Sequence, residues 1–259
     1  MAANVLVINA VQLGTVPYAL GLRLQDELAE ARKQSRIADT LVLLEHAPVI
    51  TLGRSAKAQH LLASAEQLRS RGVEVFECNR GGDVTFHGPG QLVGYPIFNI
   101  VEMRPKVGAV DYVRRLEEVL IRACDDFGIA SGRVPGLTGV WTSAGARQQA
   151  KIAAIGVHIS RGVTSHGFAL NVTTDLDYFR LIVPCGIEAR PVTSMAQELG
   201  RSVELPEVAE AVARKFGQVF DAQVLRVETV DALLGRTVGM PLEQPREMRA
   251  LHGEETFTA

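Results

Sequence analysis

The chain has 259 residues, of which 47% are hydrophobic and 22% charged, and its formal net charge is −2. This balance is typical of a globular protein with a full core, and it carries no electrostatic footprint for nucleic acid. Apolar runs stay short of the roughly 18–20 residues that span a bilayer, and no secretion signal opens the chain. Three widely spaced cysteines argue against a disulfide framework or a zinc site, so we expect a soluble, cytoplasmic protein.

The first half of the chain alternates short apolar runs with amphipathic stretches. Apolar residues at four-residue spacing predict a helix over residues 16–33, with Thr15 as its N-cap. A short helix should follow Ser64, and a longer one should present an apolar face from Val110 to Phe127. The strands predicted between these helices are residues 4–10, 40–44, 49–52, 73–76 and 92–100.

The second half is richer in strands. A tight hairpin at Gly162 should join two of them. The predicted strands are residues 139–141, 152–159, 163–172, 178–183 and 222–227, with helices over 205–220 and 230–234. Because strands come in adjacent groups, we expect an α+β fold: a mixed, largely antiparallel sheet with flanking helices on one side. We expect a main domain over 1–200, a small helix-strand subdomain over 201–239 packed on it, and a poorly ordered tail over 240–259.

A glycine-rich segment, Arg80-Gly-Gly-Asp-Val-Thr-Phe-His-Gly-Pro-Gly-Gln91, lies between two predicted strands. Glycine lets backbone approach a ligand closely, so this segment is interpreted as the wall of a binding site, with a plain hairpin loop as the alternative. It lacks the Gly-Lys-Ser/Thr ending of a P-loop and the spacing of a dinucleotide fingerprint. We therefore expect it to contour an apolar or amide-containing ligand.

Cys185 is the candidate nucleophile, because it lies between Pro184 and Gly186 at the end of a predicted strand. A thiol needs a nearby cation to form thiolate at neutral pH, and Lys151, which opens an apolar strand, is the best candidate. The alternative for Lys151 is a solvated charge at a strand end. Cys124 and Cys78 are interpreted as structural, whereas His87, His158 and His166 remain candidates for proton transfer or packing.

The chain resembles the lipoyl(octanoyl) transferase family in several blocks that occur in order. They are Leu44-Glu-His-Ala-Pro48, Thr51-Leu-Gly-Arg54, the segment 80–91, Lys151-Ile-Ala-Ala-Ile-Gly156, His166-Gly-Phe-Ala-Leu-Asn171 and Pro184-Cys-Gly186. Phe86 stands where a tyrosine is common in that family. The resemblance covers roughly residues 40–190.

The resemblance implies a biotin/lipoate protein ligase-like fold and an acyltransferase that needs no cofactor or metal. Cys185 would accept the acyl group and Lys151 would lower the pKa of its thiol, so residues 1–200 would be the catalytic domain. The residues implied to line the acyl pocket are Arg80, Gly81, Gly82, Asp83, Val84, Thr85, Phe86, His87, Ala154, Ile155, Gly156, Gly167, Phe168 and Ala169.

The implied reaction transfers octanoyl from octanoyl-acyl carrier protein to a lysine of lipoyl domains, in dehydrogenase E2 subunits and the glycine cleavage H protein. It would be the first step of endogenous protein lipoylation, by a monomer. Thioester exchange on a thiol needs no ATP, which agrees with the absence of a phosphate-binding motif. Arg54, Lys57, Arg80 and Arg104 are candidate rim cations for the partners, and the favoured alternative is that each is simply a solvated charge. The alternatives are an ATP-dependent lipoate or biotin protein ligase and a non-catalytic relative that binds lipoyl domains.

Overall fold

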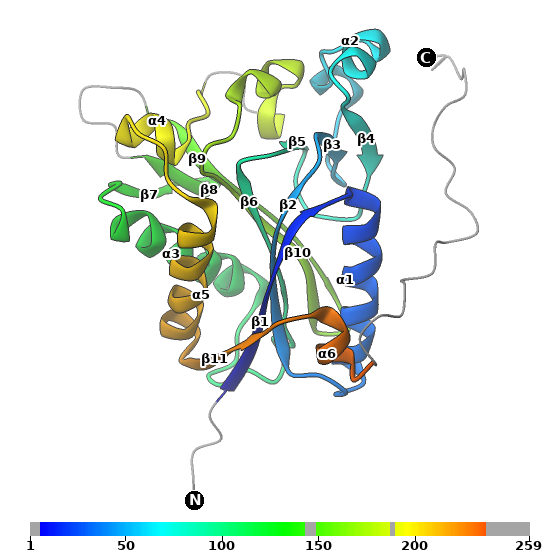
Figure 1. Cartoon of the computed structure of the whole chain (residues 1–259), viewed down its shortest axis with the longest axis vertical. Coiled ribbons are helices and arrows are strands. Elements are labelled where there is room, and N and C mark those ends of the chain that lie inside the picture. The colour runs from blue at the N-terminus through cyan, green and yellow to red at the C-terminus, as the bar shows by residue number, and fades with distance from the viewer. Residues whose placement is uncertain (1–5, 143–148, 187–189, 237–259) are drawn as a thin grey trace, which may run out of the picture.

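The computed structural model describes residues 6–142, 149–186 and 190–236, with Cys185 described by its backbone alone. Within these ranges the chain forms two sheets (Figure 1). The larger has eight strands, in the spatial order β11 (Ala222–Val227), β1 (Leu6–Val16), β2 (Asp39–His46), β6 (Gln91–Ile97), β10 (Val163–Asn171), β9 (Lys151–Ser160), β8 (Leu137–Thr142) and β7 (Ser131–Val134). The smaller has the order β4 (Glu74–Glu77), β3 (Val49–Leu52) and β5 (Val84–His87).

The large sheet is mixed. β1 pairs in parallel with both β11 and β2, and the remaining neighbours in this sheet are antiparallel. The predicted α+β class and the mixed, largely antiparallel sheet are therefore confirmed. The helices are α1 (Tyr18–Lys33), α2 (Ala65–Ser70), α3 (Ala109–Asp126), α4 (Met195–Leu199), α5 (Leu205–Phe220) and α6 (Val230–Leu234), and the 3-10 turns are η1 (Ala58–His60), η2 (Leu176–Leu181) and η3 (Pro184–Gly186). None of these helices has the length and apolar composition needed to cross a membrane.

Helices cover both faces of the large sheet, so the expectation of helices on one side is wrong (Figure 1). Leu24 and Leu28 of α1 pack on one face, in a core that includes Val93 of β6. Helices α3 and α5 pack on the other, where Leu120 and Phe216 are completely buried. Because strands β2, β6 and β10 are apolar on both faces, each face must bury against a helical layer.

The small sheet closes one end of the α1 face. β3 pairs in parallel with β4 and antiparallel with β5. Behind it lies a separate apolar cluster in which Phe86 stacks on Tyr178 at 4.6 Å between ring centroids and meets Phe179 edge-on at 5.6 Å. The small sheet therefore covers part of the large sheet and leaves space between the two sheets.

Two predicted elements are wrong in kind. Residues 178–183 were expected to be a strand, but they fall largely in η2 (Leu176–Leu181), where the Asp175 side chain accepts from the Asp177 amide and Phe179 and Leu181 are buried together. The segment 80–91, expected to be a loop, contains the strand β5, which pairs with β3. Tertiary packing and pairing override the local composition in both cases.

Several boundaries also differ from the prediction. β1 continues through Thr15 and Val16, which pair with Glu45 and His46, so Pro17 and not Thr15 precedes α1. Val110, placed on the apolar face of α3, is 71% exposed. The strand β7 and the helix α4 were not predicted. The hairpin at Gly162 is confirmed: Arg161 and Gly162 both have positive φ and join β9 to β10.

The C-terminal elements join the main sheet and core. α5 buries Val208, Val212 and Phe216, and β11 is the edge strand beside β1. The predicted division at residue 200 stays a prediction, and the predicted tail over 240–259 lies outside the described residues.

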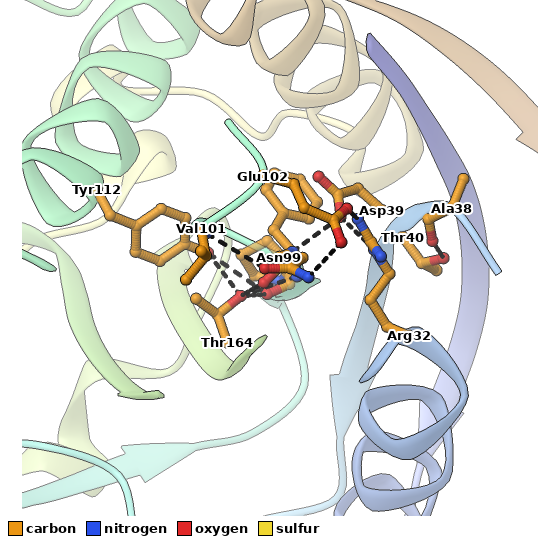
Figure 2. Close-up of polar contacts among 11 residues, drawn as sticks. Arg32, Ala38, Asp39, Thr40, Asn99, Val101, Glu102, Tyr112 and Thr164 are labelled. Atoms are coloured by element: carbon orange, nitrogen blue, oxygen red, sulfur yellow. Dashed lines mark hydrogen bonds and ion pairs between the residues drawn. The ribbon is translucent and has the colours of Figure 1, made fainter. Parts of the chain in front are cut away.

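A buried polar network ties α1 to the large sheet at the end distant from the small sheet (Figure 2). Arg32 donates to Asp39 at 2.6 Å and to Glu102 at 2.6 Å, and the Asn99 amide donates to the same Asp39 oxygen at 2.9 Å. Burial raises the pKa of the Asp39 carboxyl, against the opposing effect of these donors. These hydrogen bonds lie at the C-terminal end of α1, where the apolar core between α1 and the large sheet ends.

Glu117 is a completely buried carboxylate on the core face of α3. Its Oε1 accepts from the Gly139 amide at 3.1 Å, and its Oε2 accepts from Arg114 at 2.6 Å and Arg133 at 3.0 Å. The side chain therefore joins α3 to β7 and β8. Without it, the buried Gly139 N–H would lose its acceptor.

We predict that Glu117→Ala lowers the free energy of unfolding by about 2–4 kcal/mol, because it orphans the Gly139 amide and empties a packed site. Urea denaturation measures this change. The neighbouring Glu118→Ala removes a carboxylate that pairs with Arg122 and Arg133 but is 31% exposed, and it should cost no more than about 1 kcal/mol. Equal losses in both variants would contradict the assignment.

Candidate active site

A cavity of about 250 Å³ lies between the α1 face of the large sheet and the small sheet. Its floor comes from β6, β9 and β10, and its roof comes from residues 80–87. The lining residues are Tyr18, Arg80, Gly81, Gly82, Asp83, Thr85, His87, Val93, Tyr95, Gly136, Leu137, Thr138, Lys151, Ala154, Ile155, Gly156, His166, Gly167, Phe168 and Ala169. A small adjoining cavity of about 10 Å³ shares Thr85, Lys151, Ala154 and Ala169 and adds Pro184 among its walls.

Glycines set the height of this cavity. The Gly81 amide donates to the Val157 carbonyl at 3.0 Å, so the roof touches β9 directly. A methyl group at Gly156 would come within 2.7 Å of the Gly81 carbonyl oxygen, and one at Gly53 within 2.4 Å of the Gly82 oxygen. Side chains at these positions would force the layers apart, so only glycine permits this approach.

Arg80 is buried and braces the roof. Its guanidinium donates to the Thr51 carbonyl at 2.6 Å, to the Thr51 hydroxyl at 2.9 Å and to the Gly81 carbonyl at 3.1 Å. Arg80 is 7% exposed, so it is neither a rim cation nor a solvated charge, and both expectations are wrong for this residue. The guanidinium is hydrogen-bonded to neutral backbone and hydroxyl oxygens, and these bonds hold residues 80–82 in place.

Hydrogen bonds determine the tautomer of two buried histidines. His46 Nδ1 donates to the Val16 carbonyl at 2.7 Å, so its Nε2 accepts from the Tyr95 hydroxyl at 2.6 Å. The side-chain NH2 group of Gln91 donates to the Phe86 carbonyl and to the Asn171 side-chain oxygen. The side-chain oxygen of Gln91 therefore accepts from His87 Nδ1, at 2.8 Å.

Burial also keeps these histidines neutral. It lowers the pKa of His46 to about 4, of His87 to about 3 and of His166 to about 4. It also raises the pKa of the Tyr18 and Tyr95 hydroxyls. The histidines and tyrosines of the cavity are therefore uncharged at neutral pH.

Lys151 lies at the first position of β9 and is 7% exposed. Its ammonium nitrogen sits 4.9 Å from the centroid of the Trp141 ring, a cation–π contact across β8 and β9. A methyl group at Gly139 would come within 3.1 Å of Lys151 Cε, so this glycine leaves the space that the lysine stem occupies. The same Gly139 is bonded to the buried Glu117.

The turn η3, which carries Cys185, lies beside the cavity. Pro184 and Lys151 line the same small cavity, although the two residues belong to different elements. The Val183 amide donates to the His60 carbonyl at 2.8 Å, and Gly186, with φ of +67°, packs against Asp83 and His60. The backbone of the predicted nucleophile is thus close to the predicted lysine.

Most of the predicted pocket residues come together in the larger cavity. Val84 and Phe86 do not line it, because they alternate with Thr85 on β5 and face the apolar cluster on its other side. The structure adds Tyr18, Val93, Tyr95 and residues 136–138, at the start of β8, to the lining. No local pattern marked these residues, because they reach the cavity only through long-range packing and strand pairing. Cys124 is completely buried, as predicted.

Comparisons with known proteins agree on one family. Residues 17–217 match the family described as "Lipoyl protein ligase A/B catalytic domain". The chain is 58% identical to the octanoyltransferase of Koribacter versatilis over 96% of this chain and 98% of that protein. It is 56% identical to the octanoyltransferase of Acidobacterium capsulatum over 88% of this chain and 96% of that protein.

Solved structures show the same fold. A bi-partite lipoate protein ligase from Thermoplasma acidophilum superposes with a TM-score of 0.66 at 17% identity, covering 89% of this chain and 91% of that one. A lipoate-protein ligase A bound with ATP gives 0.65 at 16% identity, covering 88% and 92%. The family resemblance and the expected lipoate ligase-like fold are therefore confirmed. The chain belongs to the octanoyltransferases, enzymes of protein lipoylation, with a catalytic domain of the lipoyl protein ligase A/B type.

Proposed function

We propose that this octanoyltransferase moves an octanoyl group from octanoyl-acyl carrier protein to a lysine of a lipoyl domain through a thioester on Cys185. The observation that supports this most directly is that Lys151 and the turn bearing Cys185 border the same small cavity, next to a larger, mainly apolar one. The acceptors are the lipoyl domains of dehydrogenase E2 subunits and the glycine cleavage H protein. The site of action is the cytoplasm, and the monomer is sufficient.

The first half-reaction exchanges one thioester for another. The Cys185 thiolate attacks the octanoyl carbonyl, a new sulfur–carbon bond forms, and the bond to the carrier sulfur breaks. The carrier thiolate leaves and takes a proton from the Lys151 ammonium, which leaves Lys151 as a neutral amine. The Lys151 ammonium stabilises the attacking thiolate, because a nearby cation favours the charged form of a thiol. No energy source is required, since the two thioesters are similar in free energy.

The second half-reaction forms an amide. The amine of the acceptor lysine attacks the Cys185 thioester, the carbon–nitrogen bond forms, and the Cys185 thiolate leaves. Lys151, as a neutral amine, takes the proton that the attacking nitrogen releases. One residue therefore serves as cation in the first step and as base in the second.

The larger cavity is the proposed site for the acyl chain. Val93 and Ala169 offer it an apolar surface, and the neutral His87 and His166 add no charge that would have to be desolvated. Each buried methylene contributes about 0.8 kcal/mol, so the chain supplies several kcal/mol of binding free energy. Val84 and Phe86 support this site from behind β5.

We predict that mixing the protein with octanoyl-acyl carrier protein gives an octanoyl adduct on Cys185, seen by peptide mass spectrometry. Cys185→Ser should abolish that adduct and lower transfer to a lipoyl domain by roughly 10³-fold or more, because the nucleophile is lost. Cys78→Ser is the matched control and should retain both. An adduct that persists at Cys78 in Cys185→Ser would reject the assignment.

We predict that Lys151→Arg separates the two half-reactions. The guanidinium keeps the positive charge but does not lose a proton, so the octanoyl adduct should still form while its transfer to the acceptor lysine falls by about 10²-fold or more. Lys151→Met should impair both steps. Single-turnover mass spectrometry follows the adduct and the octanoylated lipoyl domain separately. Full transfer by Lys151→Arg would exclude Lys151 as the base.

We predict that Ala154→Leu shortens the acyl site, since Ala154 lines both cavities next to Lys151. Each methylene displaced from the wall costs about 0.8 kcal/mol, so kcat/KM should fall for octanoyl far more than for butanoyl carrier protein. Ala154→Ser, nearly equal in size, should keep the wild-type ratio. An unchanged ratio in Ala154→Leu would place the acyl chain elsewhere.

A further inference from the structure

We infer that His60 and Asp83 form a positioning pair that holds the turn carrying Cys185 at the mouth of the cavity. Neither residue belongs to the lysine–cysteine chemistry proposed above, and the inference rests on that proposed role of Cys185. His60 Nδ1 donates to Asp83 Oδ2 at 2.7 Å. Both side chains are largely buried, at 9% and 12% exposed, so water competes little for this contact.

Asp83 links the pair to the roof of the cavity. Its second carboxylate oxygen accepts from the Val84 amide at 2.7 Å, at the point where β5 begins. Its neighbour Gly82 accepts from the Ser55 amide at 3.0 Å, and Arg80 holds the other end of this stretch through Thr51. The carboxylate is therefore anchored to a rigid segment that already defines the acyl site.

His60 links the pair to the chain that leads into Cys185. Its carbonyl accepts from the Val183 amide at 2.8 Å, and the Leu181 carbonyl accepts from the amides of Leu62 and Ala63 at 2.9 and 3.1 Å. Leu61 and Ile182 form an isolated antiparallel bridge between them. The segment 181–183 is thus fastened to residues 60–63 along its backbone.

Gly186 completes the junction on the other side of Cys185. A methyl group at this position would come within 2.8 Å of Asp83 Oδ2 and 3.1 Å of His60 Cε1. The turn therefore rests directly on the bonded pair, and η3 packs against β5. The residues on both sides of Cys185 therefore contact this pair: Val183 is bonded to the His60 carbonyl, and Gly186 packs against Asp83 and His60.

The pair also lies close to the proposed acyl site. Asp83 also lines the proposed acyl cavity, so this residue borders both the acyl site and the turn η3 that carries Cys185. Displacement of a reacting group by about 1 Å costs up to about 10²-fold in rate. We therefore assign to the pair the alignment of the thiol with the bound thioester carbonyl.

Three substitutions of His60 test this assignment. The amide nitrogen of asparagine is the same number of bonds from the backbone as His60 Nδ1, so His60→Asn retains a donor to Asp83. The amide nitrogen of glutamine corresponds to Nε2 instead, so His60→Gln does not, and His60→Ala has no donor at all. We expect His60→Ala and His60→Gln to lower the single-turnover rate of acyl-enzyme formation by about 10- to 10²-fold, with the KM for octanoyl-acyl carrier protein within about twofold and His60→Asn near wild type.

Rapid-quench mass spectrometry of the Cys185 peptide gives the rate, and thermal unfolding confirms that each variant is folded. Rescue by glutamine as well as by asparagine, or a wild-type rate in His60→Ala, would overturn the inference. Gly186→Ala provides a second test without removing any hydrogen-bonding group. It should slow acylation in a folded protein, and an unchanged rate would equally overturn the inference. Failure of the wild-type protein to form the Cys185 adduct would reject the proposed function instead.

Discussion

The site depends on one close approach between backbones, where Gly81 contacts β9. The Gly81–Val157 hydrogen bond and the missing side chain at Gly156 bring the two layers together there. The cavity is the space left beside this contact, bordered by alanine and glycine on β9 and β10. Because the large sheet is held between helical cores on both faces, its strands cannot shift to relieve a larger residue at this point.

The roof and the cysteine turn are coupled to this contact by polar groups instead of apolar packing. Arg80 donates hydrogen bonds to Thr51 and Gly81. Asp83 accepts one hydrogen bond from the Val84 amide and one from His60. The Arg80–Thr51 and Asp83–His60 bonds join segments that are distant in the chain. Such contacts orient reacting groups more sharply than apolar packing does, because hydrogen bonds have preferred directions.

Local patterns predicted much of this molecule. The helix over residues 205–220, the strand opened by Lys151 and the hairpin at Gly162 all follow from periodicity and turn chemistry, and all are confirmed. The glycine-rich segment and the lysine and cysteine blocks indicated the family before any fold was known. The rest required long-range information. Tyr95 reaches the cavity through strand pairing, β5 exists because β3 lies beside it, and the buried Glu117 contradicts the apolar pattern of its own helix.

The buried, uncharged histidines lower the stability of the native state at acidic pH. In the unfolded chain a histidine takes up a proton near pH 6.5, whereas His46, His87 and His166 in the folded protein resist protonation until pH 3–4. Between those limits the unfolded state binds more protons, so acidification shifts the equilibrium away from the native state. The burial that keeps these three histidines uncharged in the native state therefore lowers its stability relative to the unfolded state as the pH falls below about 6.5.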